Sequence, residues 1–311
     1  MTDARQSSPG CCRVSVSEIR GTTRVFGIIG RSLSHSLSPV FWNAAFGECG
    51  IDAVYVPFPV IDGHLEPVLR GLAAAGVAGV NITMPFKEKA ASLVTEKRAP
   101  ADILDAVNTV RFNSAGEMEG TNTDAVAILS ILRDHRVSGP VTLLGAGGAA
   151  KAVMWSLCQS EIPVVYWGNR TASRLVYPAS LGGTRFESVV WEELSLQGAI
   201  ERSTMVINAT TLGWKPQDRL SALEKTLGSH HLYLDLNYAP GSRLLAAARR
   251  VGATVIDGLE VLIRQGMSAF SFLTGQPAPE AVMRASLKQG DDAFSGVLNS
   301  SDKKKKKELR P

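Results

Sequence analysis

A glycine-rich turn between an apolar strand and a helix is the feature that most constrains the fold of this chain. The motif G-x-G-x-x-A covers residues 145–150, directly after the apolar run Val141–Leu144 and at the start of a predicted helix, Ala149–Gln159. The glycines permit a tight turn and let a pyrophosphate approach the main chain, and the helix N-terminus offers free N–H groups. This context predicts a dinucleotide-binding α/β domain. The contacts with the cofactor are expected from Gly145, Ala146, Gly147, Gly148 and Ala149.

The end of the next predicted strand indicates which dinucleotide is bound. An enzyme that uses NAD usually has Asp or Glu at this point, where the carboxylate bonds the ribose hydroxyl. Here the run VVYWG is followed by Asn169, Arg170 and Thr171, with Arg174 three residues further on. Guanidinium groups bind a phosphate with two parallel hydrogen bonds, whereas a carboxylate would repel it. The sequence therefore predicts NADP as the cofactor.

Strands alternate with helices on both sides of the turn. Before it, we predict strands over residues 24–29, 53–58 and 79–83 and a helix over residues 64–75. After it, the runs MVINAT, LYLDLNY and ATVIDG are predicted strands, and Leu259–Leu273 is a predicted helix. This order favours mostly parallel sheets in two α/β units. The last helix is expected to pack back on the first unit.

Charge and cysteine content exclude several classes of protein. The net charge is +4, and the last 11 residues, with six basic and two acidic side chains, supply all of it. The rest of the chain is therefore neutral, and we expect no nucleic-acid surface. The longest runs without charge have 16 residues, short of the ~20 that cross a bilayer, and no signal peptide is expected. The four cysteines lack metal-ligand spacing, which favours free thiols in the cytoplasm and predicts no metal site.

Small polar residues gather at several points of the first unit. The hydroxyls of Ser36 and Ser38 alternate with Leu37, so both can face one pocket and donate to a carboxylate, or they form a Ser-rich turn or helix cap. Lys87 follows a predicted strand, where a partly desolvated ammonium can transfer a proton and where a surface lysine is also common. Asp124 precedes the apolar run Val126–Leu132, so by itself it is typical of a helix N-cap.

The order of the motifs resembles the shikimate dehydrogenase family. From about Arg24 to about Pro279 the chain carries HSLSP, NITMPFK, AVNT, GTNTD, GAGGAAKAV, NRTASR, INATTLG, DLNYAP and GLEVLIRQG. The resemblance implies an N-terminal α/β substrate domain and a C-terminal Rossmann NADP-binding domain, with a cleft between them. The expected divisions are a flexible leader (1–22), a substrate-binding domain (23–124), a Rossmann domain (125–258), a C-terminal helix packing back on the first domain (259–285) and a lysine-rich tail (286–311).

The resemblance also implies a reaction and roles for single residues. The reaction is the NADP-dependent, reversible reduction of 3-dehydroshikimate to shikimate, in chorismate and aromatic amino acid biosynthesis. Lys87 and Asp124 match the family's catalytic pair. An ammonium on Lys87 can stabilise and protonate the carbonyl oxygen, while Asp124 orients Lys87 and holds a substrate hydroxyl. The remaining matches are to ligands of the carboxylate (Ser36, Ser38), to a substrate-binding tyrosine near the carboxylate (Tyr238), to ligands of the ring hydroxyls (Thr83, Asn108, Gln265) and to the backbone at the nicotinamide (Leu236, Gly258).

Three residues depart from the family's pattern. Trp42 replaces the usual His and is expected to alter the wall near the serines, Ala127 replaces a Gly, and Trp214 replaces a Met that is frequent beside the nicotinamide. Substrate choice is therefore left open. The alternatives are a quinate or quinate/shikimate dehydrogenase of the degradative branch, an aminoshikimate enzyme, and a non-catalytic NADP-binding relative. We expect a small-molecule ligand, no nucleic-acid or membrane partner, and a monomer or homodimer.

Overall fold

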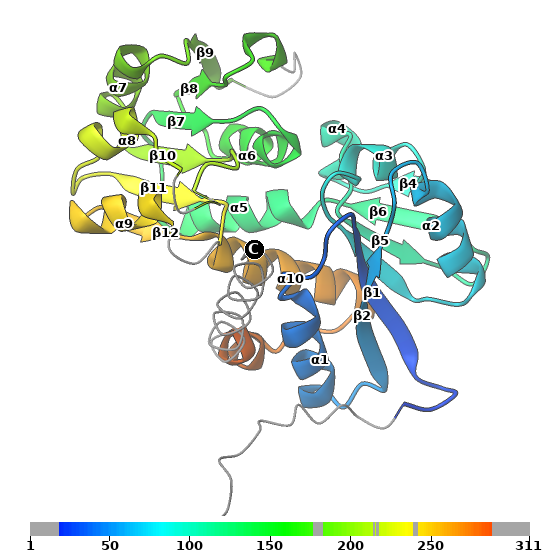
Figure 1. Cartoon of the computed structure of the whole chain (residues 1–311). Coiled ribbons are helices and arrows are strands. Elements are labelled where there is room, and N and C mark those ends of the chain that lie inside the picture. Colours follow the sequence, from blue (N-terminus) through cyan, green and yellow to red (C-terminus); the bar gives the residue numbers. More distant parts are fainter. Residues whose placement is uncertain (1–18, 177–182, 214, 216–217, 239–241, 288–311) are drawn as a thin grey trace, which may run out of the picture.

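The computed structural model describes residues 19–176, 183–213, 215, 218–238 and 242–287. Several predicted features lie outside these residues: most of the leader, Cys11, Cys12, Trp214 and the lysine-rich tail. Within the described residues, the strands and helices predicted above are confirmed as elements of an α/β fold with two sheets (Figure 1).

The first sheet is mixed, with the strand order β2-β1-β3-β5-β6-β4. Strand β1 pairs in parallel with β2 and β3, while β5 is antiparallel to β3 and β6. The edge position of β2 accommodates Pro57, which has no N–H to donate to a further strand. The strands are β1 (Arg24–Gly30), β2 (Ala53–Pro59), β3 (Gly79–Ile82), β4 (Glu96–Lys97), β5 (Thr109–Phe112) and β6 (Met118–Thr121).

Helices cover both faces of this sheet because its strands alternate apolar side chains between the two faces. Phe26 and Ile28 of β1 pack in one cluster with helix α1 (Ser38–Glu48), whereas Ile29 packs in another with α2 (Leu65–Ala74). The remaining helices of this part of the chain are α3 (Lys87–Ala91), which follows β3, and α4 (Ala101–Leu104).

The second sheet is parallel throughout, with the order β12-β11-β10-β7-β8-β9. The chain runs outward from β7 to β9, returns to β10 on the other side of β7, and continues outward to β12. This reversal places a topological switch point between β7 and β10, where α/β sheets bind ligands. The strands are β7 (Val141–Leu144), β8 (Val164–Gly168), β9 (Arg185–Val189), β10 (Met205–Asn208), β11 (Leu232–Asp235) and β12 (Thr254–Ile256).

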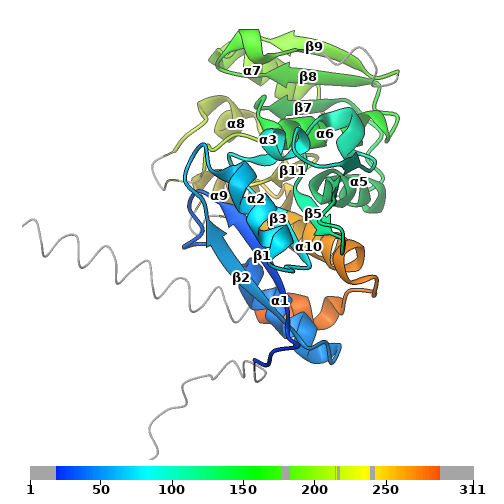
Figure 2. The same ribbon diagram turned by 90° about the vertical axis from the view of Figure 1, so that its right-hand side faces the viewer.

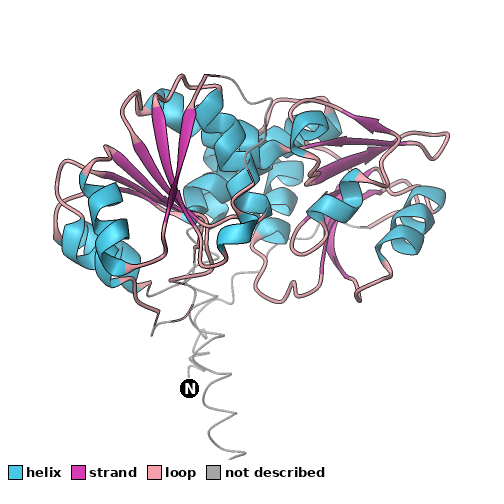
Figure 3. Ribbon diagram, turned by 90° about the horizontal axis from the view of Figure 1, so that it is seen from above, coloured by secondary structure: helices cyan, strands magenta, loops and turns pink. Residues whose placement is uncertain are grey.

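Both faces of the second sheet are also covered by helices, as the view from above shows (Figure 3). One face packs against α5 (Thr123–Asp134), α6 (Gly148–Cys158) and the start of α10 (Gly258–Thr274). The other packs against α7 (Glu193–Glu201), α8 (Ser221–Thr226) and α9 (Arg243–Arg250). A short 3-10 helix, η1 (Ala172–Arg174), follows β8.

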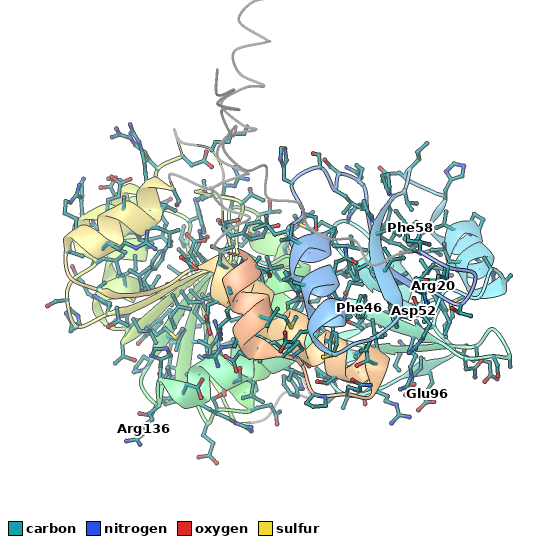
Figure 4. The ribbon with its side chains drawn as sticks, turned by 90° about the horizontal axis from the view of Figure 1, so that it is seen from below. Arg20, Phe46, Asp52, Phe58, Glu96 and Arg136 are labelled. Carbon is teal, nitrogen blue, oxygen red and sulfur yellow. The ribbon has the colours of Figure 1, made fainter. Side chains whose placement is uncertain are left out.

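Helix α10 packs on both halves of the molecule. It lies alongside α5, as Figure 2 shows, and Val261 near its start belongs to the core of the second sheet. Phe270 lies in the core of the first sheet, with its ring centroid 5.8 Å from that of Phe46. Phe46 is on α1 and is labelled in Figure 4. A Cβ at Gly266 would lie 2.5 Å from the ring of Phe41, so the close approach of α10 to α1 requires glycine there.

Candidate active site at the edges of the two sheets

The Lys87 and Asp124 side chains form an ion pair between two helix N-termini. Lys87 Nζ donates to Asp124 Oδ2 at 2.6 Å, and the two side chains are 19% and 18% exposed. Lys87 is the first residue of α3, and Asp124 is the second residue of α5. The structure therefore brings the two predicted catalytic residues into direct contact.

The interpretation of Asp124 as a helix N-cap is wrong. Asn122 occupies the cap position of α5, and its side-chain oxygen accepts from Ala125 N–H at 3.1 Å. Its amide nitrogen donates to the Ala106 carbonyl at 2.9 Å, which fixes the side chain. Because Asn122 satisfies the helix end, the Asp124 carboxylate is available to Lys87.

Asn108 and Gln265 meet through a residue that the sequence did not single out. Thr123 N–H donates to Asn108 Oδ1 at 2.7 Å, and the Thr123 hydroxyl lies 3.4 Å from Gln265 Oε1. Gln265 is held in turn by Leu262, whose carbonyl accepts from Gln265 Nε2 at 2.9 Å. Helix α10 thus brings Gln265 to the first residue of α5.

Thr83 lies just after β3, where Thr83 N–H donates to the Ile29 carbonyl of β1 at 2.8 Å. Its methyl group packs so closely on Gly30 that a Cβ at Gly30 would lie 2.5 Å from it. This contact explains why β1 ends in glycine and holds Thr83 at the carboxyl edge of the first sheet. Ligands of α/β proteins bind at this kind of edge.

The two predicted carboxylate serines lie at the start of α1. Ser36 Oγ accepts from Ser38 N–H at 3.4 Å, while Leu37 occupies the cap position without a capping side chain. The serine turn predicted as one alternative is therefore present. Ser38 is buried.

The loops after β11 and before α10 bring three predicted residues together. Gly258 N–H donates to the Asn237 carbonyl at 3.1 Å, and a Cβ at Gly258 would lie 2.6 Å from the Leu236 carbonyl oxygen. Tyr238, from the same loop, packs against the core of the first sheet. Burial raises the pKa of Tyr238, so that its hydroxyl stays protonated at neutral pH.

A buried carboxylate supports these loops. Asp235, at the end of β11, accepts from the Tyr233 hydroxyl at 2.8 Å, from Asn237 N–H at 3.0 Å and from Asn208 Nδ2 at 3.1 Å. Burial raises the pKa of Asp235, while these hydrogen bonds lower it. The sequence did not single out this group, although an acidic residue inside an apolar strand is the signal that would have found it.

The glycine turn fits a dinucleotide. Gly145 has φ of +109°, and a Cβ there would lie 2.7 Å from the Ala209 carbonyl oxygen, so the turn requires glycine. Gly147 caps α6, and apart from the adjoining backbone no described atom lies within 4 Å of a Cβ built at Gly147 or Gly148. The space beside the start of α6 is therefore open, and helix N-termini bind phosphates through their free N–H groups.

The end of β8 lies beside this turn. Gly145 N–H donates to the Gly168 carbonyl at 2.8 Å, so the residues after Gly168 start at the same edge of the sheet. Asn169 Nδ2 donates to the Thr171 carbonyl at 2.8 Å and stabilises the bend that carries Arg170. Arg170 and Arg174 are exposed, as side chains that bind a phosphate from solvent must be.

An ion pair connects the two halves of the candidate site. Lys151 of α6 donates to Glu88 of α3 at 2.6 Å, between the glycine turn and the residue next to Lys87. Among the described residues, no group of three or more His, Cys, Asp or Glu side chains is arranged to hold a metal ion.

Trp42, one of the departures from the family's pattern, lies in the core of the first sheet. Its side chain is fully buried among Phe26, Phe46, Tyr55 and Phe270. It belongs to the same cluster as Leu37, which lies between the two serines. Ala127 is buried in α5.

Comparison with known proteins gives this arrangement a family context. Residues 28–110 match the family model described as shikimate dehydrogenase substrate binding domain, and residues 258–288 match that described as shikimate 5'-dehydrogenase C-terminal domain. A shikimate dehydrogenase (NADP(+)) from Methanopyrus kandleri is 36% identical over 282 residues, which cover 87% of this chain and 97% of the relative.

Solved structures have the same architecture. Shikimate 5-dehydrogenase from Thermus thermophilus, in complex with NADP(H) and shikimate, matches with a TM-score of 0.76 at 30% identity, covering 86% of this chain and 99% of that one. Quinate dehydrogenase from Corynebacterium glutamicum, in complex with NAD, matches with a TM-score of 0.78 at 26% identity and the same coverage.

Proposed function

The chain belongs to the shikimate dehydrogenase family, and from this we propose how its site performs the family's reaction. The enzyme catalyses the reversible, NADP-dependent reduction of 3-dehydroshikimate to shikimate, in chorismate and aromatic amino acid biosynthesis. The observation that supports the site assignment is the 2.6 Å contact between Lys87 Nζ and Asp124 Oδ2, at the edge of the first sheet.

Lys87 and Asp124 carry the proton chemistry in this proposal. During reduction the substrate carbonyl oxygen gains negative charge, and the Lys87 ammonium donates a hydrogen bond and then the proton to it. Asp124 keeps the ammonium in place and accepts from a substrate hydroxyl through its other oxygen.

The other predicted residues bind and orient the substrate. Ser36, Ser38 and Tyr238 hold the carboxylate, while Thr83, Asn108 and Gln265 bind ring hydroxyls. Asn108 Oδ1 already accepts from Thr123, so its Nδ2 is the atom that faces a hydroxyl oxygen. Holding the ring at both ends orients the reacting carbon.

NADP supplies or accepts the hydride when it is bound. The N–H groups from Gly145 to Ala149 hold the pyrophosphate, the side chains of Asn169, Arg170, Thr171 and Arg174 surround the 2′-phosphate, and the backbone of Leu236 and Gly258 lines the nicotinamide. The open space over Gly147 and Gly148 supports this placement.

A quinate dehydrogenase is the second candidate, because a quinate dehydrogenase in complex with NAD has the same architecture. Two features favour shikimate. Arg170 follows β8 directly where an NAD enzyme usually has a carboxylate, and Ser36 and Ser38 are both present at the start of α1.

The test is nicotinamide absorbance with the purified protein, crossing shikimate and quinate with NADP and NAD. We expect fast NADPH formation with shikimate and at least tenfold slower turnover in the other three mixtures. Turnover only with quinate, or a preference for NAD, would move the protein to the degradative branch. Binding of NADP without any turnover would indicate a different ring substrate or a non-catalytic relative.

We propose a monomer or homodimer located in the cytoplasm, with the domain divisions given by the sequence. None of the helices in the described part of the chain is both long and apolar enough to cross a membrane. Sedimentation equilibrium at micromolar concentration measures the assembly state.

A further inference from the structure

A series of buried hydrogen bonds crosses the first sheet from Tyr55 to Asn108, one of the proposed substrate ligands. The Tyr55 hydroxyl donates to Asn81 Oδ1 at 2.7 Å. Asn81 Nδ2 donates to Thr109 Oγ1 at 3.0 Å, and the Thr109 hydroxyl donates to Asn108 Oδ1 at 3.1 Å. We call these four residues the polar chain; none is more than 6% exposed.

The orientation of the Asn81 amide follows from its neighbours. Asn81 Nδ2 also lies 3.4 Å from the Asn108 carbonyl oxygen, which only accepts, so the Asn81 amide has one allowed orientation. The Tyr55 hydroxyl has one proton and gives it to Asn81 Oδ1.

The polar chain ends on the Asn108 amide, whose oxygen already has all the hydrogen-bond donors that it can accept. Asn108 Oδ1 accepts from Thr109 Oγ1, and it also lies 2.7 Å from Thr123 N and 3.1 Å from Thr123 Oγ1. Its Nδ2 forms no hydrogen bond with any residue that the structure describes. Asn108 is thereby fixed as a donor toward the proposed substrate.

We infer that Tyr55 and Thr109 are positioning residues for substrate recognition, which act through Asn108 without touching the substrate. The inference rests on the proposed function. Removing the Tyr55 hydroxyl leaves Asn81 Oδ1 without its donor. Removing the Thr109 hydroxyl leaves Asn108 Oδ1 with its Thr123 partners alone, and Asn81 Nδ2 with only the 3.4 Å contact to the Asn108 carbonyl oxygen. An amide held by fewer partners is less well oriented, and it binds a ligand less tightly because binding must then order it.

Trp42 supports the polar chain through its contact with Tyr55. Its ring stacks on Tyr55 with the centroids 4.8 Å apart and an interplanar angle of 19°. The stacking holds the Tyr55 ring, and with it the hydroxyl, against Asn81. The departure from the family at position 42 thus acts on the site through Tyr55.

The first test uses two substitutions at Thr109 that separate its hydroxyl from its shape. Thr109→Val keeps the shape and removes the hydroxyl, and we expect the KM for shikimate to rise about tenfold, with kcat changed by less than about threefold. Thr109→Ser keeps the hydroxyl, and we expect KM within about twofold of the wild-type value. The KM for NADP is expected to stay constant in both.

Thr142→Val is the matched control. Thr142 is equally buried, in β7 of the second sheet, and its hydroxyl lies 2.8 Å from Ser203 Oγ. This substitution removes a comparable hydrogen bond outside the polar chain. We expect a similar loss of thermal stability and no change in the KM for shikimate.

Tyr55→Phe tests whether the polar chain acts as a unit. We expect this variant to raise the KM for shikimate as well, and the double variant with Thr109→Val to resemble Thr109→Val alone, because one break already interrupts the polar chain. Independent effects would multiply to about a hundredfold.

Three results would overturn the inference: an unchanged KM in Thr109→Val, equal damage in Thr109→Ser, or effects of Tyr55→Phe and Thr109→Val that multiply. A rise in KM in Thr142→Val equal to that in Thr109→Val would also overturn it. The wild-type assay distinguishes this failure from failure of the proposed function. If the wild type does not turn over shikimate, the proposed function and this inference are both wrong. If it does and the variants have the same KM for shikimate, only this inference is wrong.

Discussion

Lys87 and Asp124 can pair because other residues form the hydrogen bonds that hold the backbone around them. Asn122 caps α5, and the Lys87 carbonyl accepts from Val107 N–H at 2.9 Å, which ties the start of α3 to the segment before β5. The ammonium and the carboxylate are both less than one-fifth exposed, which strengthens their attraction compared with a surface pair.

Lys87→Ala removes the proposed proton donor. We expect turnover of shikimate to fall by ~10²–10⁴, the usual contribution of a general acid, while NADP affinity stays within about twofold. Steady-state kinetics and a fluorescence titration with NADPH measure the two quantities. Lys89→Ala, on the exposed side of the same short helix, is the control and should retain full activity. Near-normal turnover in Lys87→Ala would remove the proposed role.

The ends of β7 and β8 form the proposed cofactor site because parallel neighbours present their carboxyl ends at one edge. Leu144 of β7 is in register with Gly168 of β8, so the glycine turn and Asn169 start side by side. The choice between NADP and NAD then depends on the few exposed side chains after Gly168.

Arg170→Ala tests that choice. Loss of a guanidinium–phosphate bond is expected to weaken NADP binding about tenfold or more, and to leave NAD binding within about twofold. Isothermal titration with both dinucleotides measures the difference. Arg185→Ala on β9, whose side chain pairs with Glu187 at 2.7 Å, is the control. Equal losses for the two dinucleotides would contradict the 2′-phosphate assignment.

A buried histidine links α7 to the start of β11 and gives the fold a pH dependence. His231 Nδ1 accepts from Gly228 N–H at 2.9 Å, so its Nε2 carries the proton and donates to the Ile200 carbonyl at 3.1 Å. Burial lowers the pKa of His231 below its ordinary value of 6.5. As pH falls through this range, His231 therefore binds a proton more readily in the unfolded chain than in the native state.

We expect the free energy of unfolding to fall as pH is lowered from 7 toward 5, with a contribution from His231 of at most ~1.4 kcal/mol per pH unit. Urea unfolding at several pH values measures it. His231→Gln should be less stable at pH 8 and should show a shallower loss between pH 7 and 5. His64→Gln, at an exposed position, should keep the wild-type slope. An unchanged slope in His231→Gln would contradict this account.

Helix α10 makes the two sheets one molecule. Its start lies in the core of the second sheet, and its end lies with α1 in the core of the first. Arg264 adds polar contacts from the middle of the helix, because it pairs with Glu260 at 2.6 Å and with Asp134 of α5 at 2.5 Å. Gln265 is carried on the same segment, so the position of a proposed substrate ligand depends on the packing of both cores.

Phe270→Ala tests this dependence. Removing a fully buried phenyl ring from the cluster with Trp42 and Phe46 is expected to lower the free energy of unfolding by ~3–5 kcal/mol. Urea unfolding followed by circular dichroism measures the change. Phe272→Ala, two residues later and only partly buried, should cost less than half as much. Equal costs would indicate that α10 does not anchor through Phe270.

Local sequence determined the elements of this protein and the class of its cofactor site. The glycine turn, the strand–helix alternation and the residues after β8 are short-range patterns, in which neighbours in the chain decide backbone geometry and exposed charge. The family's motifs added the predicted site residues, including the Lys87–Asp124 pair that the structure brings into contact.

Tertiary structure decided the structural role of each polar residue near those elements. Only the folded chain showed that Asn122 rather than Asp124 caps α5, that Trp42 lies in the core, and that Tyr55, Asn81 and Thr109 form one polar chain. Tyr55 and Asn81 are 26 residues apart, and Asn81 and Thr109 are 28 apart. Such partners meet only when separate strands pair in one sheet. Local periodicity indicates on which face of a sheet a side chain lies, but it does not indicate which distant side chain it contacts there.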